Sequence, residues 1–270
     1  MTPPRQSSIS FTKATACGND FLIVPATGIA SDLAILSRRL CDRHNGVGAD
    51  GVEWTCPDSE ADVHAKLINA DGSEAEISGN GTRCVAADIS SRSEKTEIVV
   101  RTGAGLKTCR LVSSRNPVFE FETDMGSAVV HEPVAIETMW VRAVGTRVSI
   151  GNPHFVLFVE RFEDGWQRQA ALIQTQPLFP QGTNVEYVKV RGPNEIEIRL
   201  FERGVGETQS SGTGSCAAAV AAIAGRRVAS PVTVVAAGGA QTVCWDDTVN
   251  PNCVRLRGPA TLICRGEFFI

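Results

Sequence analysis

Two segments of this 270-residue chain carry the pattern Ser-Gly-x-Gly, 133 positions apart. The first begins at Ser78 and reads S-G-N-G, and the second begins at Ser211 and reads S-G-T-G. Serine is a preferred residue at the start of a helix, and the glycine that follows lets another group approach the backbone closely. Because the free N–H groups at a helix start attract carboxylate or phosphate, each segment predicts a helix start that can bind an anion.

A capped helix without a ligand explains either copy taken alone, since a single Gly-x-Gly is a weak signal. Two copies favour a ligand, because two such helix starts facing each other would hold a small anion from both sides. Polar residues precede each copy, in N-A-D-G-S-E-A-E (69–76) and E-R-G-V-G-E-T (202–208). Arg203 is suited to forming two hydrogen bonds with a carboxylate. The alternative is a surface ion pair with Glu202 or Glu207.

The rest of the chain predicts mostly β-strands. Apolar and polar residues alternate over 118–123 and 195–202, which indicates antiparallel strands with one face in water. Helical spacing of apolar residues predicts a helix over 30–44, and 217–225 is expected to be part of a buried helix. Further strands are expected at 97–101, 107–112, 146–150, 155–159, 184–190, 232–236, 241–245, 253–257 and 261–265.

The polar, turn-forming segment S-S-R-N-P (113–117) lies near the midpoint and is the expected boundary between two halves. Each half then contains several strands and one alanine-rich helix that is entered through a glycine loop. The predicted fold class is α+β, with two similar domains. They comprise residues 1–117, joined by a C-terminal strand at 260–270, and residues 118–259.

Composition argues against several classes of protein. The net charge of −4 and the pI near 5.7 provide no basic surface for nucleic-acid phosphates. The first residues lack the apolar run of a secretory signal, and the longest apolar stretch is far shorter than the roughly 20 residues that cross a bilayer. Nine cysteines form no C-x-x-C pair and no zinc-ligand spacing. We therefore expect a cytoplasmic protein with reduced thiols and without a metal, nucleic-acid or membrane partner.

Eight motifs between residues 17 and 216 carry a resemblance to the diaminopimelate epimerase family. They are C-G-N-D-F (17–21), R-H-N-G-V-G-A-D (43–50), N-A-D-G-S-E-A-E (69–76), G-N-G-T-R (79–83), G-N-P-H (151–154), G-T-N-V-E (182–186), E-R-G-V-G-E-T (202–208) and G-T-G (212–214). The resemblance implies two pseudo-symmetric domains, each a mixed sheet or barrel around a central helix, with the active site in the cleft between them. It also implies a homodimer and a cofactor-free interconversion of LL- and meso-diaminopimelate, on the route to lysine and peptidoglycan.

Inverting an α-carbon without pyridoxal phosphate requires two acid/base groups, one that removes a proton from one face and one that returns a proton to the other. Backbone N–H groups at each helix start would stabilise the charge that grows on the α-carboxylate as the carbanion forms. In the family the two acid/base groups are cysteines placed immediately before G-N-G and G-T-G, whereas this chain has Ser78 and Ser211. An alcohol is a far weaker base than a thiol, whose reference pKa is near 8.5, unless a neighbour activates it.

Three explanations of the two serines stay open. The chain belongs to a lineage that works with serine or inverts another small amino or carboxylic acid; or both cysteines were replaced by engineering; or the protein binds its ligand without turnover. Cys84 and Cys216 do not supply the missing thiols, because they lie roughly 8–9 Å further along their helices. We expect them to be core residues.

The resemblance also assigns roles to the surrounding residues. Ser78 and Ser211 are implied to be catalytic, and His154 and Glu202 are implied to tune them. For each asparagine a turn or cap role is the alternative. The residues implied to bind the substrate are Asn19, Asn69, Gly79, Asn80, Asn152, Asn184, Glu202, Arg203, Gly212 and Thr213.

Overall fold

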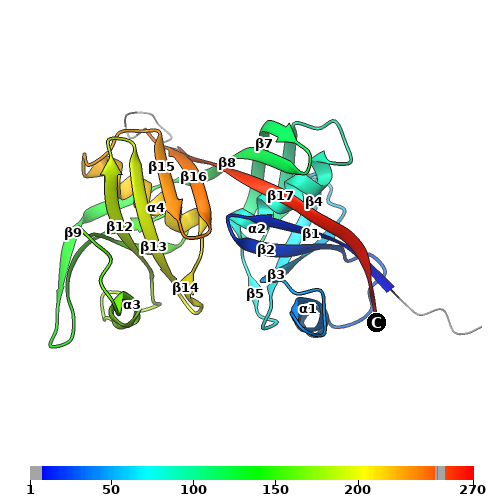
Figure 1. Ribbon diagram of the computed structural model, residues 1–270, viewed down its shortest axis with the longest axis horizontal. Helices are drawn as coiled ribbons and strands as arrows, with labels where there is room; N and C mark the ends of the chain where they lie inside the picture. The colour runs from blue at the N-terminus through cyan, green and yellow to red at the C-terminus, as the bar shows by residue number, and fades with distance from the viewer. Residues whose placement is uncertain (1–7, 247, 249–252) are drawn as a thin grey trace, which may run out of the picture. The chain divides into compact units, whose positions relative to one another are not determined.

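The computed structural model describes residues 8–246, 248 and 253–270, and the chain divides into two units (Figure 1). Unit 1 comprises Met1–Thr123 and Pro259–Ile270, and unit 2 comprises Asp124–Gly258. The expectation that the chain has no secretory signal rests partly on residues 1–7, which lie outside the described residues. Within the described ranges, no helix has both the length and the apolar character needed to cross a bilayer.

Unit 1 is built from strands that pair in a closed ring. The strands are Ser8–Ala16 (β1), Asn19–Pro25 (β2), Gly51–Cys56 (β3), Val63–Asn69 (β4), Glu74–Ala75 (β5), Glu97–Thr102 (β6), Gly105–Arg115 (β7), Val118–Ser127 (β8) and Cys253–Phe269 (β17). The pairing order is β17, β1, β2, β3, β4, β6, β7 and β8, and β8 pairs in turn with β17. β2 runs parallel to β3, and β4 runs parallel to β6.

The core of unit 1 forms around the helix α2 (Gly79–Ser90), which follows the first Ser-Gly-x-Gly segment. Cys84, Val85, Ala86 and Ala87 are buried against apolar side chains from β1, β2, β4, β6, β7 and β8. Small side chains allow the surrounding strands to approach this helix on every side. The expectation that Cys84 is a core residue is confirmed.

The helix α1 (Leu33–Cys41) covers the other face of β2, β3 and β4. It is shorter than the predicted helix over 30–44 because both of its ends are fixed by aspartates. Asp32 accepts hydrogen bonds from the backbone N–H groups of Ala34 and Ile35, which caps the helix start. Asp42 accepts backbone hydrogen bonds from His44 (2.7 Å) and Asn45 (2.8 Å), which turn the chain away after Cys41.

Unit 2 repeats this plan, as Figure 1 shows. Its strands are Val129–Glu137 (β9), Arg142–Ser149 (β10), Pro153–Phe158 (β11), Asn184–Gly192 (β12), Glu195–Glu202 (β13), Gly206–Thr208 (β14), Val232–Ala236 (β15) and Gly239–Cys244 (β16). They pair in the order β9, β10, β11, β12, β13, β15, β16 and β17. The parallel pairs β11–β12 and β13–β15 correspond to the parallel pairs of unit 1.

Two helices complete unit 2. The helix α4 (Gly212–Ala224) follows the second Ser-Gly-x-Gly segment and is the centre of the core, where Cys216 and the alanines after it are buried. This confirms the buried helix that the apolar stretch 217–225 predicts. The helix α3 (Trp166–Gln174) packs Trp166, Ala170 and Ile173 against the opposite face of β11 and β12. α3 therefore occupies the position that α1 occupies in unit 1.

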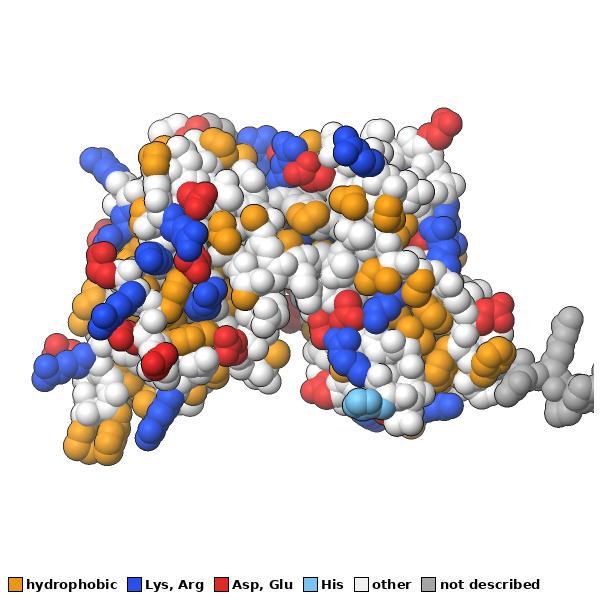
Figure 2. All heavy atoms as spheres, viewed as in Figure 1, with side chains coloured by type: hydrophobic (Ala, Val, Ile, Leu, Met, Phe, Trp, Pro, Cys, Tyr) orange, Lys and Arg blue, Asp and Glu red, His pale blue; other side chains and the backbone are white. Residues whose placement is uncertain are grey.

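The alternating strand at 195–202 has one face in water, as predicted. Ile196, Ile198 and Leu200 of β13 are buried, while the residues between them are more exposed. Figure 2 shows acidic and basic side chains interspersed over β12 and β13. Among them, Glu197 forms ion pairs with Arg191 (2.7 Å) and Arg199 (3.2 Å).

The sequence predicts separate strands at 253–257 and 261–265, and this prediction is wrong, because β17 is continuous from Cys253 to Phe269. Pro259 lies within the strand at the point where its partner changes. Arg257 still pairs with Thr242 of β16, whereas Thr261 pairs with Thr15 of β1. A proline is tolerated there because its missing N–H falls between two ladders.

A buried hydrogen bond joins α1 to β3 and offers a test of the core of unit 1. The indole N–H of Trp54 donates to Oγ of Ser37 at 2.8 Å, and both residues are buried. We expect Ser37→Ala to lower the free energy of unfolding by about 1–3 kcal/mol, because the indole N–H loses its partner. Urea denaturation followed by circular dichroism measures this. Ser113→Ala, which removes an exposed hydrogen bond to Glu120, is the control; equal stability of the two variants would contradict the expectation.

Candidate active site

In each unit, predicted site residues gather at one end of three neighbouring strands. In unit 1, Gly51 pairs with both Phe21 and Asn69, so Asn19 and Asn69 lie at the same end of the sheet. In unit 2, His154 pairs with Asn184, and the adjacent Val185 pairs with Phe201, which precedes Glu202. Four pairs of residues occupy equivalent positions, and the members of each pair are 133 positions apart: Asn19 and Asn152, Glu53 and Glu186, Asn69 and Glu202, Ser78 and Ser211.

Ser78 caps the central helix of unit 1. Its backbone is extended (φ −123°, ψ 120°), and its Oγ accepts a hydrogen bond from the backbone N–H of Gly81 at 3.0 Å. Thr82 also donates to the carbonyl oxygen of Ser78, from its backbone N–H and from its hydroxyl, both at 2.8 Å. Asn80, predicted to bind substrate, is buried, and its Oδ1 accepts from Arg83 at 2.5 Å. The predicted helix start is confirmed.

Ser211 caps the central helix of unit 2 in the same way, with an extended backbone (φ −142°, ψ 129°) and an Oγ that accepts from the N–H of Gly214 at 3.3 Å. Its hydroxyl donates to Oε2 of Glu202 at 3.1 Å. A further hydrogen bond joins Nδ2 of Asn152 to Oγ1 of Thr213 at 3.4 Å. Four residues of the predicted site therefore lie together at the start of α4.

Near the start of α4, His154 lies between two hydrogen-bond partners. Its Nε2 is 2.9 Å from Oδ1 of Asn152, and its Nδ1 is 2.7 Å from Oε1 of Glu186. Because Oδ1 of Asn152 can only accept a hydrogen bond, Nε2 of His154 carries a hydrogen. The hydrogen bond between Nδ1 of His154 and Oε1 of Glu186 then holds one proton between the two groups. Burial raises the pKa of Glu186, although the charge of His154 opposes this. The pair fixes the imidazole and, through Asn152, the first turn of α4.

Glu53 is the residue of unit 1 that sequence analysis missed. It lies in β3 with its side chain toward α2, is only 3% exposed, and burial raises its pKa to about 8. A Cβ added at Gly81 would fall 2.0 Å from Oε1 of Glu53 and 3.3 Å from Cβ of Ser78. The carboxyl group and the serine therefore flank the same point, and glycine is required there because any side chain would displace the carboxyl group.

A signal for Glu53 is present in the sequence. The tripeptides G-V-E (51–53) and N-V-E (184–186) are 133 positions apart, like the two serines. In the structure, a Cβ added at Gly214 would fall 3.1 Å from Oε1 of Glu186, so the glutamate of unit 2 also lies beside its helix start. Extending the repeat backwards from the serines would have identified both glutamates.

The other predicted substrate-binding side chains have partners within their own units. Asn184 donates to the carbonyl oxygen of Pro153 (3.0 Å) and accepts from the backbone N–H of Arg203 (2.9 Å), so it joins two loops. Asn69 donates to Ser73 (3.0 Å), and Asn19 donates to Asp50 (2.6 Å). These bonds match the turn-stabilising alternative for the asparagines. Among the described residues, the side-chain Oδ1 atoms of Asn19 and Asn69 accept no hydrogen bond.

The guanidinium of Arg203 is exposed and donates to the carbonyl oxygen of Gln181 at 3.0 Å. Among the residues that the structure describes, it forms no ion pair with Glu202 or Glu207. Instead, Oε2 of Glu207 accepts from Gln167 at 2.9 Å. The surface ion pair considered as an alternative role for Arg203 is therefore not formed.

A network of charged side chains holds the loop around Asn19. The sequence analysis assigns this network no role. Arg43 donates to Asp20 and to Asp50, each at 2.8 Å, and Lys13 lies 3.1 Å from Asp20. Burial opposes ionisation of Asp20, but the hydrogen bonds from Arg43 and Lys13 outweigh it and lower the pKa of this carboxyl group. The network joins the motifs C-G-N-D-F and R-H-N-G-V-G-A-D.

The two cysteines of the central helices do not contribute acid/base groups. Cys216 is fully buried, as is Cys84, whose pKa burial raises far above its usual value. The described ranges contain no group of three His, Cys, Asp or Glu residues positioned to hold a metal ion.

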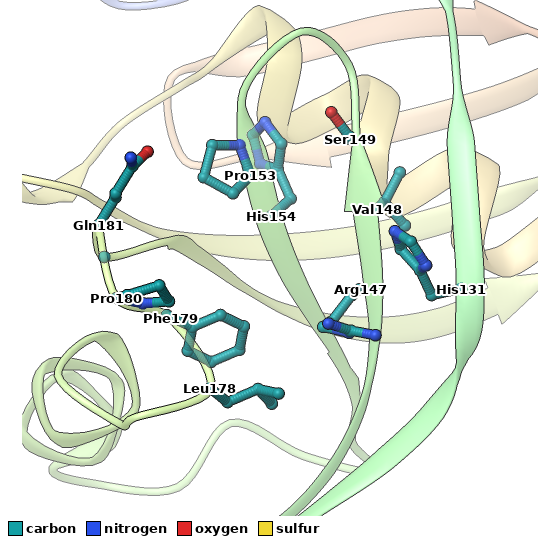
Figure 3. A pocket seen from close by; sticks show the side chains of 11 residues that line it. His131, Arg147, Val148, Ser149, Pro153, His154, Leu178, Phe179, Pro180 and Gln181 are labelled. Atoms are coloured by element: carbon teal, nitrogen blue, oxygen red, sulfur yellow. The ribbon is translucent and has the colours of Figure 1, made fainter.

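A pocket of about 220 Å³ lies beside the segment that carries His154 (Figure 3). It is lined mainly by apolar groups, and its lining includes His154 but neither Ser211 nor Glu202. The lining residues are His131, Arg147, Val148, Ser149, Pro153, His154, Leu178, Phe179, Pro180, Gln181 and Gly182.

Comparison with known proteins finds matches over nearly the whole chain. A model of the diaminopimelate epimerase family matches residues 11–131 and 146–263. The chain is 38% identical to the diaminopimelate epimerase of Desulforudis audaxviator, over 96% of this chain and 99% of that protein. It is 37% identical to the diaminopimelate epimerase of Moorella thermoacetica, over 96% of this chain and 98% of that protein. The resemblance that the eight motifs indicate is confirmed.

Solved structures show the same fold at low sequence identity. A phenazine biosynthesis protein of the PhzF family from Bacillus anthracis has a TM-score of 0.75 at 14% identity and covers 98% of this chain and 100% of its own. A hydroxyproline epimerase from Agrobacterium vitis has a TM-score of 0.69 at 17% identity and covers 97% of this chain and 91% of its own. The predicted fold class, two similar α+β domains around central helices, is confirmed.

The buried carboxyl group of Glu53 predicts how stability depends on pH. The folded chain holds a proton there up to about pH 8, whereas the unfolded chain releases it near pH 4.5. The free energy of unfolding should therefore fall as pH rises between these values, by up to about 1.4 kcal/mol per pH unit from this group. Glu53→Gln removes this contribution, so the variant should gain stability relative to the parent as pH rises. Urea denaturation at several pH values measures the difference, and parallel curves would contradict it.

Proposed function

The chain belongs to the diaminopimelate epimerase family, and from this premise we propose that it interconverts LL- and meso-diaminopimelate. The reaction inverts one α-carbon and serves the synthesis of lysine and peptidoglycan. The observation that carries the proposal is the duplicated helix start, in which a serine caps a buried helix and a carboxyl group lies beside it.

We propose that one serine acts on each face of the α-carbon. The backbone N–H groups of the first helical turn, at Gly79 and Asn80 and at Gly212 and Thr213, would bind the α-carboxylate. The same groups stabilise the negative charge that develops when the α-proton leaves. In this mechanism the chain's own groups supply both the acid and the base.

Serine becomes a competent base when its own proton has an acceptor. The Ser211 hydroxyl already donates to Glu202 at 3.1 Å. As the α-carbon loses its proton to Oγ of Ser211, the hydroxyl proton of Ser211 would move to the carboxylate of Glu202. The energetic cost is then that of protonating a carboxylate and not that of forming an alkoxide. The weak basicity of an alcohol therefore does not exclude serine at this position.

Other contacts of unit 2 position these groups. His154, held by Glu186, fixes Asn152, and Asn152 in turn donates to Thr213 of the helix start. We propose that Arg203, whose guanidinium is exposed, binds the distal carboxylate of the substrate. Asn184 would support Arg203 indirectly, because its Oδ1 accepts from the backbone N–H of Arg203. Asn19 and Asn69 would present their side-chain oxygens to the ammonium groups of the substrate.

Family membership also leads us to propose a homodimer in the cytoplasm. Free thiols at all nine cysteine positions fit a reducing compartment. Light scattering coupled to size-exclusion chromatography should give about twice the chain mass of 28.8 kDa. A mass of one chain across the accessible concentration range would reject the dimer.

Hydrogen–deuterium exchange at the α-carbon tests the proposed activity. In D2O, the protein should introduce deuterium into both LL- and meso-diaminopimelate and interconvert them. Ser78→Ala and Ser211→Ala should each slow interconversion by about 10²–10⁴-fold, the usual contribution of a general acid or base. Ser215→Ala is the matched control, because Ser215 lies on the same helix and its Oγ has no partner among the described residues.

The double variant Ser78→Cys, Ser211→Cys separates the alternatives. Activity only in this variant would identify the serine protein as a binding form without turnover. If no version binds or exchanges diaminopimelate, the substrate assignment is wrong, and other small amino or carboxylic acids become the candidates.

A further inference from the structure

Unit 1 contains a buried carboxyl group whose neighbours in the sheet are apolar. On β3, Glu53 pairs with Ile23 on one side and Leu67 on the other, and both of these residues belong to the apolar core around α2. No donor among the described residues forms a hydrogen bond with Glu53. A carboxyl group buried without a partner destabilises a protein by several kcal/mol when ionised, so its position requires an explanation.

The carboxyl group faces the start of α2. Its Oε1 lies 2.0 Å from the point that a Cβ of Gly81 would occupy, and Cβ of Ser78 lies 3.3 Å from the same point. Ser78 already accepts a hydrogen bond from Gly81. Its hydroxyl proton has no acceptor among the residues that the structure describes, which leaves it available to Glu53.

Comparison of the two units shows why Glu53 is needed. In unit 2, the Ser211 hydroxyl donates to Glu202, the last residue of β13. The equivalent residue of unit 1, at the end of β4, is Asn69, which cannot accept a proton at neutral pH. Unit 1 therefore has no equivalent of Glu202, the carboxylate that accepts from Ser211. Glu53 is the carboxyl group that lies beside Ser78.

Resting on the proposed epimerase function, we propose that Glu53 is the proton acceptor and donor of unit 1 and acts through the hydroxyl of Ser78. When unit 1 removes the α-proton, the C–H bond breaks, the proton binds Oγ of Ser78, and the Ser78 hydroxyl proton moves to the Glu53 carboxylate. The electron pair remains on the α-carbon and is stabilised through the α-carboxylate at the helix start. In the opposite direction Glu53 returns the proton by the same route.

The surroundings of Glu53 favour its protonated form. Glu53 lies close enough to Cys84 of α2 to affect the pKa of that thiol, and Arg83, Cys17 and Asp20 also affect it. Arg83 donates from Nη2 to Oδ1 of Asn80 and from Nε to the carbonyl oxygen of Pro259, while its Nη1 has no hydrogen-bond partner among the described residues. Burial alone raises the pKa of Glu53 to about 8, so at neutral pH it holds a proton in most molecules. Unit 1 is then ready to donate a proton while unit 2 accepts one.

The first test is Glu53→Gln, assayed separately with each stereoisomer in D2O. The amide has the same shape but cannot exchange protons as an acid, so interconversion should fall by about 100-fold or more. The isomer whose α-proton is removed by Ser211 should still exchange that proton for deuterium with retention of configuration. Ser37→Ala, which perturbs β3 from its opposite face, is the control for a general structural effect and should leave exchange and interconversion unchanged.

Two further measurements distinguish proton transfer from structural support. In the parent protein, kcat/KM should rise with pH through about 8 in the direction where Glu53 is the base, and should fall above that pH in the other direction. Glu53→Gln should abolish these inflections. Ser78→Cys added to Glu53→Gln should restore interconversion, because a thiol needs no carboxylate partner.

The outcomes separate this proposal from the proposed function. If the parent protein exchanges neither isomer, the epimerase assignment fails and the role of Glu53 fails with it. If the parent is active and Glu53→Gln interconverts the isomers at the parental rate, only the role of Glu53 is overturned. Loss of exchange with both isomers, without rescue by Ser78→Cys, would show that Glu53 supports the structure alone and would also overturn the proposal.

Discussion

The start of each central helix is the constraint on which the rest of this structure depends. A serine accepts a hydrogen bond from the backbone N–H of a glycine three residues later, and a glutamate packs against that glycine. Any larger residue at Gly81 would collide with Glu53, and one at Gly214 would collide with Leu200. The pattern Ser-Gly-x-Gly is therefore a packing requirement as well as a capping signal, and it brings a carboxyl group to the one part of the helix where unpaired N–H groups favour negative charge.

Around this shared geometry the two units have different side chains. Unit 2 has a histidine at position 154, a glutamate at 202 and a buried glutamate at 186, whereas unit 1 has Phe21, Asn69 and Glu53 at the equivalent positions. The histidine of unit 2 shares a proton with Glu186, which leaves Glu202 to accept from Ser211. Unit 1 has no histidine at this position, and no described residue forms a hydrogen bond with Glu53. The duplicated fold thus provides two chemically different environments for two identical serines.

The sequence predicted the parts of the fold that depend on local chemistry. The capping serines, the buried alanine helix and the alternating strand at 195–202 all have signals within a few residues. The helix α3 was missed because Gly165 precedes it without a side-chain cap, so no start signal marks it. The sequence predicts two strands in place of β17, because a proline is typical of the end of a strand. Pro259 is accepted within β17 because the partner strand changes at this point.

Glu53 could not be identified from its strand alone, for a related reason. Between Val52 and Trp54 it resembles a solvent-facing residue of an alternating strand. The strand lies between α1 and α2, so both of its faces are buried. That covering depends on the tertiary fold, and only the 133-residue repeat carries information about it in the sequence.

The continuity of β17 has a consequence for the connectivity of the two units. Residues 124–258 form unit 2 as one contiguous segment, whereas the barrel of unit 1 combines residues from both sides of that segment, because β1 pairs with the second part of β17. Without Pro259–Ile270, β1 would lack its neighbour on one side, and this edge of the barrel would be open. Closure of the unit 1 barrel therefore requires residues that are separated from β1 by the whole of unit 2.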